Sequence, residues 1–165
     1  MEGLLKLIKE RRSIRNFTSK KVPIEEIDEL LEAARWAPSG GNVQPLRYVI
    51  VTGREAIEAI KMISPGLFGE PPAMIVMCFN KDKILPTSQV HFIDLGTALQ
   101  NILLMAYSKG LGCCTVASFD AEAVAELLSL PNKIKPVLLL VLGYPDGHPS
   151  PPPRLPLNEL IVGRV

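Results

Sequence analysis

Residues 94–108 read DLGTALQNILLMAYS, and this stretch decides how the 165-residue chain folds. Its apolar side chains recur so densely that, wound into a helix, they cover nearly every face. Gly110 follows closely and suits the left-handed residue that commonly ends a helix. We expect a helix that is buried all round, as the central core helix, as part of a subunit interface, or as both.

Shorter apolar runs on both sides of this helix are typical of strands. The sequence predicts strands at 46–52, 73–79, 113–116 and 137–142. The runs at 73–79 and 137–142 are continuous, yet far shorter than the roughly 20 residues that span a bilayer. We therefore expect them to be buried strands of a sheet.

Four further helices are expected around these strands. Residues 2–10 suit one helix, and Pro23 suits the first turn of a second that Pro38 stops. The capping-box pattern Thr52-x-x-Glu55 predicts a third helix, and residues 120–128 a fourth. Helices and strands mix without strict alternation, which predicts a single α+β domain over residues 1–165.

The overall charge gives no sign of a polyanionic partner. Against 18 Lys and Arg stand 17 Asp and Glu, so the net charge of +1 favours neither nucleic acid nor an anionic membrane. The segment 2–10 is amphipathic and lacks the apolar core of a signal peptide. We expect a cytoplasmic protein.

Cysteine and histidine are too few and too scattered for a disulfide framework or a metal site. The adjacent Cys113 and Cys114 are either a redox-active pair or two small buried residues. His91 and His148 have no partner at metal-ligand spacing, so we expect no metal. We also find neither a complete G-x-G-x-x-G nor a P-loop.

Three polar segments are candidates for chemistry. If the chain is extended at residues 11–15, Arg11, Ser13 and Arg15 share one side, and two guanidinium groups flanking a hydroxyl suit a phosphate. The alternative is a solvated basic helix end. The segment 38–45 combines glycines with amide side chains and is either a binding loop or a simple connection.

The third segment is a proline-rich stretch from about residue 145 to Pro156, which excludes regular structure and predicts an extended arm. Arg154 is its lone cation. If the arm returns to the N-terminal segment, Arg154 completes a phosphate clamp; otherwise it is a surface arginine.

Taken together, and in their order along the chain, these segments resemble the nitroreductase family, and the resemblance extends over nearly the whole chain. The resemblance rests on five motifs: RRSIRNF at 11–17, APSGGNVQP at 37–45, DxGxAxQN at 94–101, GLG at 110–112 and LGYP at 142–145. It implies a nitroreductase-like α+β fold with a central, mainly antiparallel sheet flanked by helices. The long helix would then lie at the interface of a homodimer that holds FMN between its subunits.

The resemblance also implies a role for each site residue. It places Arg11, Ser13 and Arg154 on the FMN phosphate, with Arg12 near it. It places Arg15 beside the flavin N1/O2 edge as electrostatic support. It implies further that one subunit supplies the backbone near flavin N5, through Thr115, Val116, Ala117 and Ser118. The neighbouring subunit would supply the loop that covers the cofactor, through Pro38, Ser39, Asn42 and Gln44.

The implied activity is ping-pong oxidoreduction, in which NADH or NADPH reduces the flavin and a nitroaromatic, quinone or similar small molecule reoxidises it. No residue of the chain is expected to act as a nucleophile, because the cofactor carries the hydride. The alternatives are an FMN-binding protein of this fold that destroys flavin or removes halogen, an electron carrier without NAD(P)H turnover, and an α+β domain without a cofactor.

The sequence departs from the family pattern at two places. Leu46 follows the Gln-Pro pair where an aromatic residue is frequent, which changes only packing. Only residues 80–93 separate the second predicted strand from the long helix, whereas larger members insert helices there that roof the pocket. We therefore expect an open or differently covered pocket.

Overall fold

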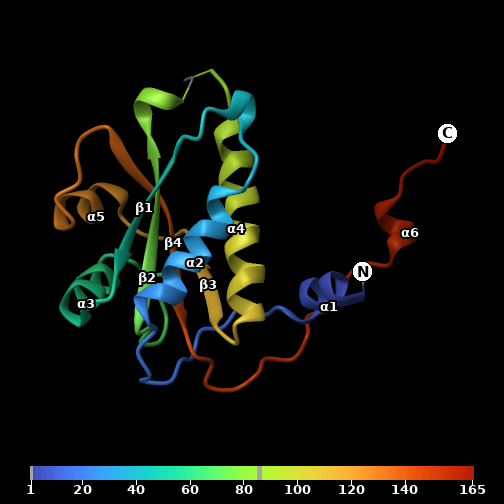
Figure 1. The fold of residues 1–165 in the computed structure, drawn as a ribbon, viewed down its shortest axis with the longest axis horizontal. Coiled ribbons are helices and arrows are strands. Elements are labelled where there is room, and N and C mark those ends of the chain that lie inside the picture. The colour runs from blue at the N-terminus through green and yellow to red at the C-terminus, as the bar shows by residue number, and fades with distance from the viewer. Residues whose placement is uncertain (1, 85–86) are drawn as a thin grey trace.

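The computed structural model describes residues 2–84 and 87–165, and its centre is a four-stranded sheet (Figure 1). The strands are β1 (Leu46–Val51), β2 (Ala73–Asn80), β3 (Gly112–Val116) and β4 (Ile134–Gly143). Their order is β1-β2-β4-β3, and every neighbouring pair is antiparallel. The predicted α+β class and antiparallel sheet are confirmed.

Helices cover both faces of the sheet (Figure 1). On one face, α2 (Ile24–Arg35) and α4 (Val90–Ser108) pack against side chains such as Ile75 and Leu140. On the other face, α3 (Arg54–Met62) and α5 (Ala121–Leu127) pack against neighbours such as Val76 and Leu139. Because successive strand residues point to opposite faces, the apolar runs 73–79 of β2 and 136–142 of β4 supply side chains to both layers.

The remaining helices lie away from the sheet (Figure 1). The first is α1 (Glu2–Glu10), which carries the exposed apolar residues Leu4, Leu5 and Ile8. The second is the short α6 (Leu157–Leu160), which the sequence analysis did not predict. As expected, residues 146–156 form no helix or strand, and every residue from 146 to 165 is exposed.

A single chain accounts for only part of the burial predicted for the long helix. In a single chain only one stripe of α4 is buried, formed by Asp94, Ala98, Ile102 and Ala106 at four-residue spacing. The helix also begins at Val90, four residues earlier than predicted, and ends with Gly110 at a φ of 75° as expected. The opposite side of α4 is therefore a partly open apolar surface.

One local prediction, the capping of the third helix by Thr52, was wrong. Gly53 is the N-cap of α3 and no side chain caps it, because the helix begins one residue too late for Thr52 to do so. Of the two interpretations of Cys113 and Cys114, the structure confirms small buried residues, because the two side chains lie on opposite faces of β3 in different apolar clusters. In the part of the chain described, no helix has both the length and the apolarity to cross a membrane.

Candidate functional site

The segment after α1 runs along the edge strand β3. Ser13 forms a bridge with Cys113, and the Ile14 amide donates to the Cys113 carbonyl over 2.9 Å. Ile14 is buried against Gly112, where a Cβ would lie 2.5 Å from an Ile14 side-chain carbon. Ser13 and Arg15 are exposed on either side of Ile14, so the predicted alternation holds at these three residues.

A cavity of about 300 Å³ lies between this segment, the C-terminal half of α4 and the start of the arm. Arg11 lines this cavity, and its Nε is buried and has no hydrogen-bond partner among the described residues. Arg12 lines the same cavity, but its Nη1 already donates to the carbonyls of Lys9 and Arg11. A buried guanidinium N–H without a partner is costly. Arg11 and Arg12 place two guanidinium groups at one cavity, and such groups bind oxyanions well.

The end of β3 supplies the neighbouring surface. Thr115, Ala117 and Ser118 are exposed, whereas the Val116 side chain belongs to the core and leaves only its backbone for a ligand. Burial raises the pKa of the Cys114 thiol, and the positive charge of Arg15 offsets part of that rise. Arg15 follows Ile14, whose amide bonds to the Cys113 carbonyl, so the backbone at Arg15 lies beside β3.

The loop Pro38–Gln44 is held by its own polar groups. Ser39 Oγ accepts from the Gln44 amide over 3.0 Å, and Gln44 Nε2 donates to Asn42 Oδ1 over 3.0 Å. Asn42 and Gln44 both have positive φ, of 55° and 53°. Non-glycine residues rarely adopt this conformation, and strain of this kind persists mainly at functional sites.

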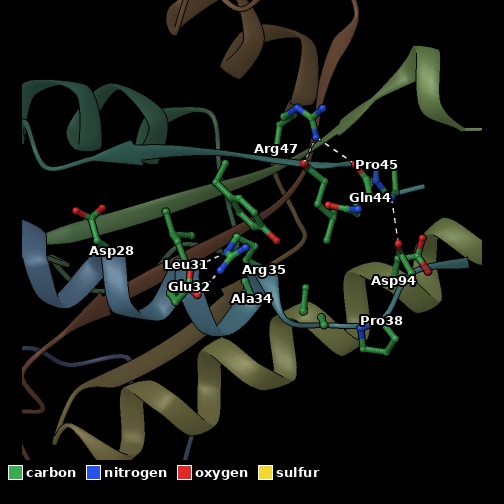
Figure 2. Close-up of a pocket in the computed structure, with 15 residues that line it drawn as sticks. Asp28, Leu31, Glu32, Ala34, Arg35, Pro38, Gln44, Pro45, Arg47 and Asp94 are labelled. Atoms are coloured by element: carbon green, nitrogen blue, oxygen red, sulfur yellow. Dashed lines mark hydrogen bonds and ion pairs between the residues drawn. The ribbon is translucent and has the colours of Figure 1, made fainter. Parts of the chain in front are cut away.

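The buried carboxylate of Asp94 fixes this loop to the start of α4, because Asp94 Oδ1 accepts from the Gly40 amide over 3.0 Å. A Cβ on Gly40 would collide with Val90, so the loop lies directly on the helix. Figure 2 shows Pro38, Gln44 and Asp94 around a cavity of about 410 Å³ between α2 and β1. Sequence analysis assigned Asp94 no role, although a lone carboxylate in an apolar helix was the available signal.

The predicted site residues therefore form two groups at opposite ends of α4. The loop contacts the helix near Asp94, and the Arg11 cavity reaches Tyr107, thirteen residues on and about 20 Å along the axis. Arg154 joins neither group in one chain, since it is exposed and, among the described residues, donates only to the Pro153 carbonyl. A single chain assembles parts of the predicted site, but not the whole.

Comparisons with known proteins identify the fold. The model of the Nitroreductase family matches residues 8–65 and 60–144. A protein of Methanothermobacter thermautotrophicus, provisionally named NADH dehydrogenase/NAD(P)H nitroreductase, is 36% identical over 156 residues, covering 89% of this chain and 80% of its own.

Two solved structures carry the same likeness. A nitroreductase family protein of Clostridium difficile is 30% identical with a TM-score of 0.84, and the match covers 98% of each chain. The NADPH:FMN oxidoreductase of Vibrio harveyi, solved in complex with NAD+, is 27% identical with a TM-score of 0.85, covering 98% of this chain and 77% of that one.

Proposed function

Since this chain belongs to the nitroreductase family, we propose that it is an FMN-dependent NAD(P)H oxidoreductase whose active unit is a homodimer. The observation that carries the proposal is the separation of the two polar groups by about 20 Å along α4. Two copies placed with their α4 helices together would bring the Pro38–Gln44 loop of one copy to the Arg11 end of the other. Each site would then be built by both chains.

Exposed apolar surface supports a second copy as the partner. One side of α4 is only partly covered, and α1 presents Leu4, Leu5 and Ile8 to solvent. The arm and the residues that follow it carry six more exposed apolar residues, Leu155, Leu157, Leu160, Ile161, Val162 and Val165. An exposed apolar surface of this extent, spread over segments that leave the body, is typical of a chain that is covered on assembly.

The phosphate end of FMN fits the Arg11 cavity. The guanidinium groups of Arg11 and Arg12, which line the cavity, would supply donors and positive charge to the phosphate, and the exposed hydroxyl of Ser13 would add a donor from the same segment. Arg154 would join them in the dimer through the arm. The chain has no glycine loop for a pyrophosphate, which favours FMN over FAD.

The other residues would orient the ring. Arg15 would place its charge at the N1/O2 edge, where negative charge accumulates on reduction. The backbone of residues 115–118 would lie near N5, and the loop from the second copy, with Pro38, Ser39, Asn42 and Gln44, would cover the ring. When bound, FMN supplies hydride transfer at N5, from NADH or NADPH and then to a nitroaromatic, quinone or similar acceptor in a ping-pong sequence.

Identification of the flavin and a turnover assay test this function together. Heat release and chromatography should yield about one FMN per chain, and the loaded protein should oxidise NADH or NADPH faster when a quinone is added. Recovery of FAD, or of no flavin, would refute the cofactor assignment. If the protein bound FMN but did not oxidise NAD(P)H, it would instead be an electron carrier.

We keep a cytoplasmic location in the proposal because Cys78, Cys113 and Cys114 are all free thiols.

A further inference from the structure

The loop between α3 and β2 contacts both segments that the proposed function places around the flavin ring. The Gly66 amide donates to the Ser118 carbonyl over 3.3 Å, and a Cβ on Gly66 would lie 3.1 Å from the Ser118 side chain. A Cβ on Gly69 would collide with the carbonyl oxygen of Arg15. Residues 66–69 therefore connect the segment beside Arg15 to the segment beside Ser118.

This loop is fixed at each end. The Leu67 side chain is buried, and its amide donates to the Ser64 carbonyl over 2.9 Å. Gly69 has a φ of 74°, and its carbonyl accepts from Lys61 Nζ over 2.8 Å. A loop held by core packing and by hydrogen bonds on both sides presents its outward side chain in a set position.

That outward side chain is Phe68, which is 65% exposed. Phe92 is also exposed, but it packs against the rings of Phe79 and His91. Among the described residues, Phe68 has no aromatic partner. The phenyl group is therefore not packed in the core, although core packing holds Leu67 and a hydrogen bond from Lys61 holds Gly69.

We infer that residues 66–69 form a further wall of the flavin site and that Phe68 is the surface on which planar aromatic electron acceptors pack. The inference rests on the proposed function, which places the flavin beside Arg15 and residues 115–118. Aromatic rings pair by stacking or edge contact, so a fixed phenyl group would favour nitroaromatics and quinones over acceptors without a ring. Between β2 and α4 the described residues contain only the 3-10 turn Lys81–Lys83, which leaves this wall to another segment.

Phe68→Ala tests the inference on the FMN-loaded protein with two kinds of acceptor. A naphthoquinone needs a surface to pack on, whereas ferricyanide is a small ion without an aromatic ring. We expect kcat/KM for the naphthoquinone to fall on the order of three- to tenfold, with ferricyanide reduction changed less than about twofold. Phe68→Tyr should retain naphthoquinone turnover, since it keeps the ring.

Met62→Ala is the matched control, because Met62 is an even more exposed apolar residue and lies at the end of α3. It should change neither rate. Equal losses with both acceptors, or the same naphthoquinone loss in Met62→Ala, would overturn the role of Phe68. Failure of the wild-type protein to bind FMN would instead count against the proposed function, so the two failures can be told apart.

Discussion

The two ends of α4 differ in how far a single chain completes them. At its start, the Pro38–Gln44 loop satisfies its own polar groups, through Ser39, Asn42, Gln44 and the buried Asp94. Near its other end, Arg11 keeps a buried N–H without a partner among the described residues. One end is preformed, whereas the other has two guanidinium groups at a cavity and a donor that the chain leaves unsatisfied. Under the proposed function, a bound phosphate and the loop of a second copy would complete the site.

The largest effect should come from removing the arm after Pro149. The deleted residues are all exposed and include the apolar side chains Leu155 and Leu160, so the body should still fold while dimerisation fails. We expect a monomer that binds no FMN at micromolar concentration, measured by light scattering and by flavin absorbance.

Arg154→Ala in the full chain separates the two roles of the arm. It removes one charge without removing apolar surface, so this variant should stay dimeric and bind FMN about tenfold more weakly. If the protein truncated after Pro149 remained a dimer with a full flavin content, the arm would not be needed to hold the two copies together or to bind FMN.

The second prediction concerns the sharing of sites between chains. Arg11→Ala and Gln44→Ala should each weaken FMN binding by about one to two decades, because each removes contacts from both sites of its own homodimer. After subunit exchange, a mixed dimer has one doubly altered site and one intact site. Titration of the mixture should therefore recover a tight fraction, up to one site per mixed dimer.

A mixture in which exchange is demonstrated by mass spectrometry, but in which no tight sites return, would place Arg11 and Gln44 in the same chain's site. The comparison between the ends of α4 would then need another explanation. Two Arg11→Ala variants carrying different tags are the matched control, since their exchange creates no intact site.

Asp94→Ala should have a smaller effect, confined at first to the preformed end. It removes the acceptor of the Gly40 amide and leaves that N–H without its partner, which costs about 1–3 kcal/mol of stability. The loop should loosen, and FMN affinity should fall by about tenfold. Thermal unfolding and FMN titration measure the two effects, and Asp120→Ala at the exposed N-cap of α5 is a control that lowers stability without touching the loop.

If Asp94→Ala lowered the melting temperature but left FMN affinity unchanged, the loop would not need its anchor to bind the cofactor.

The fold was predictable because its signals are local. The apolar runs at 73–79 and 137–142 gave the central strands, and Gly110 ended α4 as expected. The one-sided burial of α4 was not predictable, because the sequence pattern of an apolar helix is the same whether its residues are covered by the core or by a second copy. The predicted capping of α3 by Thr52 was wrong because a cap depends on the residue at which the first turn begins, and α3 begins one residue too late.

The candidate site was less accessible from the sequence than the fold. The exposure of Ser13 and Arg15 followed from alternation, but the separation of Arg11 from the Pro38–Gln44 loop depends on the length and direction of α4. The approach of Gly69 to Arg15 joins residues far apart in the chain and leaves no periodic pattern. Contacts of this kind appear only once the tertiary structure is known.

The smallest predicted effect is a pH dependence at the Arg11 end, where Cys113 lines the cavity. Burial raises the pKa of the Cys113 thiol from 9.0 to about 12. Above pH 9 the unfolded chain loses this proton while the folded chain keeps it, so stability falls as pH rises from about 9 toward 12. Between pH 9 and 10 the wild-type protein should lose about 1 kcal/mol more unfolding free energy than Cys113→Ala. Urea unfolding of both proteins at the two pH values measures this, and comparing each protein with itself cancels the cavity left by the substitution. Burial raises the pKa of Cys78 to about 12 as well, and Cys78 lies on the other face of the sheet. Cys78→Ala should therefore also reduce the loss of unfolding free energy between pH 9 and 10. An identical pH dependence in wild type and Cys113→Ala would mean that water reaches Cys113 in the folded chain, and that the Arg11 end is more open than its buried side chains indicate.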